Sequence, residues 1–199
     1  TVLAAIKTAK KYGTVVSYDL NYRPSLWKAI GGKERAQEVN KEIAKYVDVM
    51  IGNEEDFTAC LGFEVEGTDA NLSKLNTDSF KKMIEKVVKA YPNFQAVATT
   101  LRQVKTATVN DWSAMVYDGE QCYFSTKYHL HMVDRVGGGD AFAGGLIHSL
   151  AEGRSPKYAL EFAVAASALK HSINGDFNLV TPAEVETLMN GDGSGRVQR

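Results

Sequence analysis

The chain has 199 residues, of which 44% are hydrophobic and 24% charged, a composition typical of a folded globular domain. Its 23 lysines and arginines almost balance its 24 acidic residues, and the net charge of −1 argues against non-specific nucleic-acid binding, which needs a basic surface. No apolar run reaches the roughly 20 residues that span a bilayer, and residues 1–12 do not resemble a signal peptide. Cys60 and Cys122 match no zinc or redox spacing, so we expect reduced core thiols in a cytoplasmic protein with no membrane partner.

The first half of the chain alternates between helical and extended patterns. Apolar residues at helical spacing predict helices over 1–12, 33–46 and 79–91, and a further helix opens after Asn53. Short β-branched or apolar runs predict strands over 14–18, 47–51 and 95–100, of which the first two are expected to be buried. This alternation favours an α/β fold, in which helices cover a parallel sheet.

The second half has a different texture. Short strands are predicted over 106–109, 114–117, 122–125 and 131–134, with a hairpin turn at Asp118-Gly119. Helices are predicted over 141–150, 156–171 and 182–189, and residues 191–199 are expected to form a disordered tail. The chain does not begin with Met, and its first element is a helix with no strand before it. Because parallel α/β domains usually start with a strand, we expect a part of a longer protein.

The most informative segment is MVDRVGGGDAFAGGLIHSL, which predicts a strand, a triple-glycine turn and a helix. Glycines allow a backbone to approach an anion closely, and the free N–H groups of a helix N-terminus attract negative charge. The segment lacks the Lys-Ser/Thr pair of a Walker A loop and fits the dinucleotide fingerprint poorly. Asp140 lies in the first helical turn, where it can take a proton from a hydroxyl that attacks a phosphate, or can simply cap the helix.

At this point the residues resemble a known family. The segment VDRVGGGDAFAGG resembles the D-T-x-G-A-G-D-x-F signature of the ribokinase-like (PfkB) carbohydrate kinases. VVSYDLNYRPSLW is similar to a D-x-N-x-R segment of the 2-keto-3-deoxygluconate kinase subgroup, and IGNEEDF is similar to the family's N-x-x-E segment. The chain departs from the family pattern at four positions. These are Arg135 for Thr, Gly138 for Ala, Asp56 for Glu and Arg102 for a frequent Gly.

The resemblance implies a three-layer ribokinase-like fold with a mostly parallel sheet. Residues 1–190 would form its C-terminal, nucleotide-binding portion. Family members are well over a hundred residues longer at the N-terminus, so the first strands and the small β-sheet lid would be missing here. We expect the open edge of the sheet at residues 14–18 to be covered by self-association or by a companion N-terminal segment, since bare strand edges invite pairing.

The resemblance also implies catalytic roles around the glycine turn. Asp140 would be the general base that deprotonates the attacking sugar hydroxyl. Gly137, Gly138 and Gly139 would supply N–H groups to the transferring phosphate. Gly137 and Gly139 would also bind the nucleotide. Asp176, in the segment GDFN, would reach the sugar, although a turn explains it equally well.

Further roles fall on the loops that follow the first strands. Arg23 would hold a carboxylate or phosphate, alternatively being a surface arginine before a proline. Asn21 would contact the nucleotide or merely order its turn. Asp19 would likewise touch a ligand or order the same turn. Asn53 is assigned to the nucleotide, while Glu55 and Asp56 would act on Mg²⁺ through water.

The alternative for Asn53 and the acids after it is plain helix capping. Thr100 and Arg102 would line the nucleotide just after a strand. Two histidines, His129 and His131, alternate on one face of an extended stretch. We expect no metal there, because a site needs a third ligand. His148 and His171 are interpreted as ordinary helix residues.

The sequence therefore predicts a kinase that uses ATP and Mg²⁺ to phosphorylate a small sugar acid, most specifically 2-keto-3-deoxygluconate. Two alternatives stay open. The chain could belong to another sugar kinase of the same fold, such as a fructokinase or ribokinase, or it could be a non-catalytic fragment that keeps only the nucleotide-binding half.

Overall fold

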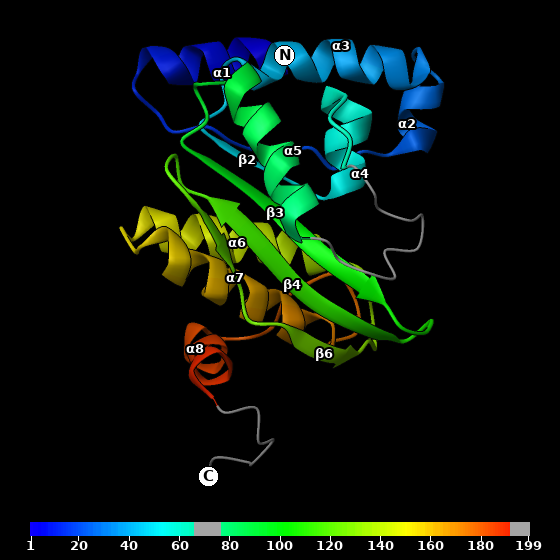
Figure 1. Ribbon diagram of the computed structural model, residues 1–199, viewed down its shortest axis with the longest axis vertical. Coiled ribbons are helices and arrows are strands. Elements are labelled where there is room, and N and C mark those ends of the chain that lie inside the picture. The colour runs from blue at the N-terminus through cyan, green and yellow to red at the C-terminus, as the bar shows by residue number, and fades with distance from the viewer. Residues whose placement is uncertain (66–76, 192–199) are drawn as a thin grey trace. The chain divides into compact units, whose positions relative to one another are not determined.

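The computed structural model describes residues 1–65 and 77–191 (Figure 1). The chain divides into two compact units. The first unit comprises residues 1–103 and 114–123, and the second comprises residues 104–113 and 124–199. The tail predicted over 191–199 lies outside the described residues apart from Gly191.

Parallel strands organise the first unit. β1 (Ser17–Asp19) pairs with β2 (Val49–Gly52), with Ser17 opposite Val49, and β2 pairs with β3 (Ala96–Val104), with Met50 opposite Val97. The order continues through β4 (Val109–Tyr117) to β5 (Cys122–Phe124). The predicted α/β class, with parallel strands joined by helices, is confirmed.

The four helices predicted in the first unit are present, and the structure adds a short helix over 24–28 and a π-helical turn that were not predicted. The helices of this unit are α1 (Val2–Lys11), α2 (Pro24–Lys28), α3 (Gly32–Ala44), α4 (Glu54–Asp56), the π-helical turn Phe57–Leu61, and α5 (Thr77–Ala90). In α5, the helical spacing of apolar residues correctly indicates which side of the helix is buried. Its buried residues Phe80, Met83, Ile84 and Val87 fall at the spacing of one helix face and pack into the main core.

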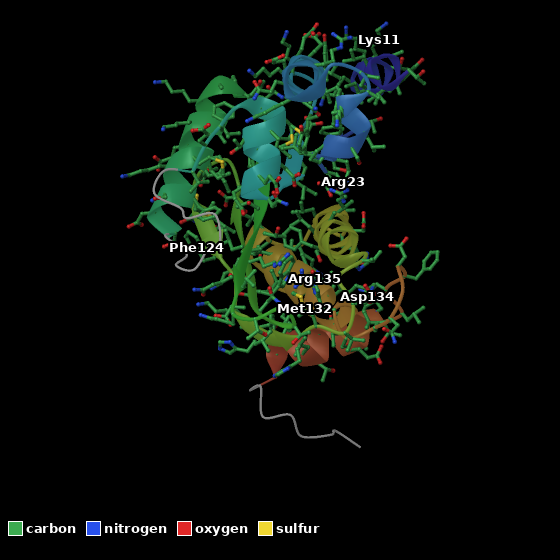
Figure 2. All side chains as sticks on the ribbon, turned by 90° about the vertical axis from the view of Figure 1, so that its right-hand side faces the viewer. Lys11, Arg23, Phe124, Met132, Asp134 and Arg135 are labelled. Carbon is green, nitrogen blue, oxygen red and sulfur yellow. The ribbon has the colours of Figure 1, made fainter. Side chains whose placement is uncertain are left out.

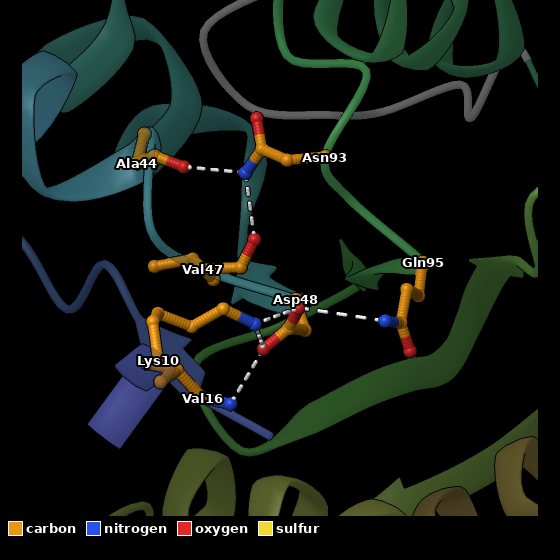
Figure 3. Close-up of polar contacts among 7 residues, drawn as sticks. All are labelled: Lys10, Val16, Ala44, Val47, Asp48, Asn93 and Gln95. Carbon is orange, nitrogen blue, oxygen red and sulfur yellow. Dashed lines mark hydrogen bonds and ion pairs between the residues drawn. The ribbon is translucent and has the colours of Figure 1, made fainter. Parts of the chain in front are cut away.

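α1 is held by partial apolar packing and by an ion pair. Three of its apolar residues pack, partly buried, against the main core: Leu3, Ile6 and Ala9. None of its residues is buried. The Lys10 ammonium lies 2.6 and 2.7 Å from the two carboxylate oxygens of buried Asp48, which also accepts the Val16 N–H at 2.8 Å (Figure 3). The Gln95 amide donates to the same carboxylate at 3.4 Å. Asp48 therefore joins α1 to the strand region, and its buried charge is compensated.

The second unit contains an antiparallel pair and three helices. β6 (Tyr128–His131) pairs with the first half of β4, with Trp112 opposite Tyr128. The helices are α6 (Gly138–Ala151), α7 (Pro156–Lys170) and α8 (Pro182–Asn190). α6 and α7 lie side by side (Figure 1). They approach closely because Gly145 has no side chain: a Cβ there would lie 3.0 Å from the Ala163 Cα.

The prediction of a buried strand over 14–18 is wrong in position and burial. β1 begins only at Ser17, which is exposed, and Val15 is 61% exposed. The physical reason is its place in the sheet. Among the described residues, β1 lies at one end of the strand order and pairs with β2 alone.

Three of the strands predicted in the second half of the chain differ from the observed ones in position or length. Residues 105–108 form the loop before β4, which begins at Val109, and the Thr106 hydroxyl accepts the Val109 N–H at 3.0 Å. The strand predicted over 114–117 is the end of the nine-residue β4, and the strand predicted over 131–134 lies three residues earlier, as β6. Polar residues hid β4. Asn110 and Asp111 are buried there, which period-two reasoning does not anticipate.

Cys60 is a buried free thiol, as predicted, and burial raises its pKa to about 12. Cys122 is a half-buried free thiol that packs against the edge of the main core. Among the described residues, no helix is both long and apolar enough to cross a membrane.

Candidate active site

The glycine turn begins α6 in a way that only glycine permits. Gly137 is the N-cap and has φ +75°, in the left-handed region. A Cβ at this position would lie 2.2 Å from the Asp176 carbonyl oxygen. At Gly139 a Cβ would meet nothing within 4 Å, so the backbone there faces open space. The turn thus combines a tightly packed side with an accessible one.

Asp140 lies on the accessible side. It is the third residue of α6 and is exposed. The alternative that Asp140 caps the helix is wrong, because the N-cap is Gly137 and no side chain caps this end. Within the described residues, the amides of Gly139 and Asp140 have no backbone acceptor. The first turn of α6 therefore presents unpaired N–H donors beside a carboxylate, an arrangement suited to an anion and a proton acceptor.

A cavity of about 560 Å³ opens beside this turn within the second unit. Gly137, Asp140 and Asp176 contribute its polar end. Its other walls are formed by α6, α7, the start of α8 and the segment between α7 and α8; they include Gly144, His148, Phe162, Ala166, Phe177 and Asn178. The volume suits a drug-sized or nucleotide-sized ligand. The predicted positions of Asp140 and Asp176 are thereby brought together at one cavity.

Asn178 and Phe177 also line the cavity, although neither was predicted as a site residue. The Asn178 amide donates to the Ala166 carbonyl at 3.2 Å, while its buried Oδ1 has no partner among the described residues. Phe177 is 80% exposed beside the cavity. The sequence signal that could have indicated them is their place in the segment GDFN, directly after Asp176, which was predicted to reach the sugar. Ala165 and Ala166 pack in the core cluster that α7 and α8 share, and Ala166 also lines the cavity.

The segment before the turn is fixed by its own side chains. The Asp134 carboxylate accepts the N–H groups of Val136 at 3.0 Å and Gly175 at 2.8 Å, and these hydrogen bonds lower its pKa. The Arg135 guanidinium donates to the Ala107 carbonyl. Met132, Asp134 and Arg135 are labelled in Figure 2. Arg135, found where the family usually has Thr, thus ties the turn to the loop between β3 and β4.

Arg23, Asn21 and their neighbours belong to the first unit. Arg23 is exposed at the N-cap of α2 and its guanidinium donates to the Tyr22 carbonyl (Figure 2). Asn21 adopts φ +40°, a conformation that asparagine tolerates better than most residues, and its N–H donates to Asp19 at 3.2 Å. Both residues follow the carboxyl end of β1, where open α/β sheets bind ligands.

Asp56 joins two loops of the first unit. Asn53 and Asp56 form a capping box: the Asn53 side chain accepts the Asp56 N–H at 2.9 Å, and the Asp56 carboxylate accepts the Asn53 N–H at 3.0 Å. The other carboxylate oxygen accepts the Tyr22 N–H at 2.8 Å. Asp56 is buried, whereas Glu55 is exposed.

These hydrogen bonds give the Asp56 carboxylate a structural role in the loop, and its action on Mg²⁺ through water stays a prediction. The described residues contain no group of three or more acidic, histidine or cysteine side chains that could hold a metal ion. Nearby Glu54 is half-buried, and burial raises its pKa, while the charge of Arg102 acts in the opposite direction.

The expectation that Thr100 and Arg102 follow a strand is wrong. Both lie within β3, which continues to Val104, and both are half-buried. β3 is longer than the apolar run because its polar end still belongs to the ladder. Their role toward a nucleotide stays a prediction.

The family model described as "pfkB family carbohydrate kinase" matches residues 1–178. The chain therefore belongs to the pfkB family of carbohydrate kinases. It is 29% identical to 2-dehydro-3-deoxygalactonokinase of Haloferax volcanii over 96% of this chain and 52% of the relative. It is 27% identical to 2-dehydro-3-deoxygluconokinase of Thermoproteus tenax, over 87% of this chain and 46% of the relative.

Among solved structures, 2-dehydro-3-deoxygluconokinase of Thermotoga maritima matches with a TM-score of 0.87 and 46% identity, covering 96% of this chain and 55% of that one. A putative ribokinase II of E. coli, solved with ATP and Mg²⁺, matches at a TM-score of 0.69 and 20% identity, which shows the ribokinase-like fold alone. The chain spans about half the length of the curated relatives it matches.

Proposed function

We propose that the protein containing this chain transfers the γ-phosphoryl group of ATP to a hydroxyl of 2-keto-3-deoxygluconate, which is 2-dehydro-3-deoxygluconate in the relatives' names. The supporting observation for the substrate class is the 46% identity to the Thermotoga maritima kinase, together with two curated relatives named for 2-dehydro-3-deoxy sugar acids. In this proposal residues 1–190 supply the nucleotide-binding portion of the enzyme.

Asp140 acts as the general base in this scheme. Its exposed carboxylate takes the proton of the attacking sugar hydroxyl as the new O–P bond forms and the bond between the γ-phosphorus and the bridging oxygen of ATP breaks. The unpaired amides of Gly139 and Asp140 at the start of α6, with that of Gly137, stabilise charge on the transferring phosphoryl group. The Gly138 amide, predicted as a further donor, already donates to the Arg135 carbonyl at 3.4 Å. Asp176, at the same cavity, orients the sugar.

Nucleotide and substrate carboxylate engage further residues. The cavity walls between α6 and α8 receive the nucleotide, with Asn21, Asn53, Thr100 and Arg102 as additional nucleotide residues. Arg23 binds the sugar carboxylate or a phosphate, because a guanidinium can hold either with two parallel hydrogen bonds.

Magnesium, when bound with ATP, neutralises phosphate charge. Glu55, which is exposed, would meet the ion through water. Asp56 contributes by holding the loop that carries Tyr22 and Arg23, given its hydrogen bonds.

The test is a substrate panel with the full-length protein. ATP consumption would be measured with 2-keto-3-deoxygluconate, 2-keto-3-deoxygalactonate, 5-dehydro-2-deoxygluconate, fructose and ribose. We expect the highest kcat/KM for 2-keto-3-deoxygluconate. A preference for fructose or ribose would replace the proposed substrate, and no phosphorylation of any compound would contradict the kinase assignment.

A further inference from the structure

Beneath the glycine turn lies a histidine to which sequence analysis gave no role. His171 follows the last residue of α7 and is only 3% exposed. Its Nδ1 lies 2.6 Å from the Ser167 carbonyl, and its ring packs against Trp112 with the centroids 4.8 Å apart. The imidazole is therefore fixed in orientation on two sides by groups of the same unit.

The ring occupies the space that a side chain at position 138 would need. Gly138 is the first residue of α6 and is buried. A Cβ placed there would lie 2.7 Å from both Cε1 and Nε2 of His171, closer than real Cβ atoms approach. Gly138, unlike Gly137, does not have a positive φ, so its backbone conformation does not require glycine. The His171 ring thus leaves no room for a Cβ at position 138.

The same end of α7 holds the turn through hydrogen bonds. The Ser167 hydroxyl donates to the Gly138 carbonyl at 2.7 Å. The His171 carbonyl accepts the N–H groups of Val133 at 2.8 Å and Asp134 at 3.3 Å. Residues 167–171, at the end of α7, therefore hold both the backbone before the triple glycine and the glycine turn itself by hydrogen bonds.

We propose that His171 is a positioning residue for the glycine turn. Together with Gly138, it forms a size-matched pair that sets how far the first amides of α6 stand from a bound phosphoryl group. His171 contacts no reacting atom in this scheme. It acts through Gly138, and its effect on catalysis rests on the proposed kinase function, whereas its packing against Gly138 does not.

A double-mutant cycle in the full-length protein tests the pair. Gly138→Ala forces the turn away from the ring. We expect its Tm to fall by about 3–10 °C, from typical overpacking costs. Its kcat should fall about 10–100-fold, as for small displacements of catalytic groups, with a smaller change in the KM for the sugar. His171→Asn removes Cε1 and Nε2 yet keeps an amide that can donate to the Ser167 carbonyl. In this background Gly138→Ala should cost less than about 2 °C and less than about threefold in kcat.

Two control variants distinguish relief of the steric clash at position 138 from a non-specific destabilisation of the glycine turn. Ser167→Ala removes the hydrogen bond to Gly138 but leaves the ring in place, so Gly138→Ala should still cost its full amount there. Gly139→Ala has open space for its Cβ, and its Tm should not fall. If His171→Asn does not fold, the cycle is repeated with His171→Ala.

Equal penalties of Gly138→Ala with and without His171 would overturn the proposal. Rescue of Tm without rescue of kcat would also overturn the positioning role, leaving only a packing contact. If wild-type protein phosphorylates no sugar, the proposed function fails, but the Tm cycle still reports on the pair.

Discussion

Asp140 is the residue whose position most directly predicts catalysis. It is exposed in the first turn of α6 without being the helix cap, so Asp140→Asn should leave the fold intact. We expect kcat of the full-length enzyme to fall about 10²–10⁴-fold, the usual worth of a positioned base, with little change in the dissociation constant of ATP. Steady-state kinetics and calorimetric ATP titration measure both quantities. A kcat within about threefold of wild type, roughly 0.65 kcal/mol of barrier, would remove Asp140 from the mechanism.

Asp56 makes a contrasting residue-scale prediction. Asp56→Ala removes the acceptor for two N–H groups, those of Asn53 and Tyr22, and should lower the free energy of unfolding by about 1–3 kcal/mol. The KM for the sugar acid should rise, because Arg23 follows Tyr22 directly. Glu55→Ala, in the same helical turn but exposed, is the matched control and should change stability by less than about 0.5 kcal/mol. Urea denaturation and substrate titration test this. Equal stability losses for the two variants would contradict the structural role of Asp56.

At the scale of elements, the ion pair between Lys10 and Asp48 adds to the apolar packing that holds α1. Lys10→Ala leaves the buried Asp48 carboxylate without its cation (Figure 3). Removing one partner of a fully buried pair costs about 3–5 kcal/mol. The Lys10 side chain is 36% exposed, so we expect a smaller loss, about 1–2 kcal/mol. Lys11→Ala, one residue further along the same helix, should be nearly neutral. Denaturant unfolding of both variants decides the matter, and a neutral Lys10→Ala would show that α1 is held by other contacts.

The β4–β6 pair predicts how stability depends on pH. Burial raises the pKa of the Asp111 carboxyl, but the hydrogen bond and charge of His129 and the charge of Lys105 outweigh this and lower it below its usual value. A carboxyl with a lowered folded-state pKa stabilises the fold above its ordinary pKa of about 3.9, and this contribution is lost as the pH falls through the folded-state value.

Asp111→Asn should therefore reduce stability at pH 7, and its difference from wild type should shrink as the pH falls below about 4. Thermal unfolding between pH 2.5 and 7 measures this. Glu120→Gln, exposed in the turn before β5, serves as the control and should follow wild type throughout. A constant difference between wild type and Asp111→Asn across this range would refute the electrostatic explanation.

For the whole molecule, the prediction concerns where nucleotide binds. Hydrogen exchange of the full-length protein with and without ATP and Mg²⁺ should show slowed exchange at residues 137–145 and 176–180, which border the cavity beside α6. The turn before β5 and residues 81–94 border a separate cavity of about 660 Å³ and should be unaffected. Protection confined to the latter region would place the nucleotide elsewhere.

Much of this fold is encoded in local sequence. The apolar spacing of α5, the glycine turn before α6 and the capping residues Asn53, Ser155 and Thr181 all act within a few residues along the chain. Such signals depend on helix periodicity and on backbone groups near the helix ends, so they can be interpreted without knowing the tertiary structure. The parallel strand–helix alternation and the importance of the glycine turn belong to this class.

Only the tertiary structure decided the contacts between distant residues. The hydrogen bond from Tyr22 to Asp56 spans 34 positions, that from Ser167 to Gly138 spans 29, and His129 meets Asp111 across 18. These contacts give structural roles to Asp56, which was predicted to act on Mg²⁺ through water, to Ser167 in α7 and to His129 in β6. Local patterns could not reveal them, because a buried polar group is stabilised by whichever donor or acceptor the fold brings near it, and that neighbour is set by the packing of the elements rather than by adjacent sequence.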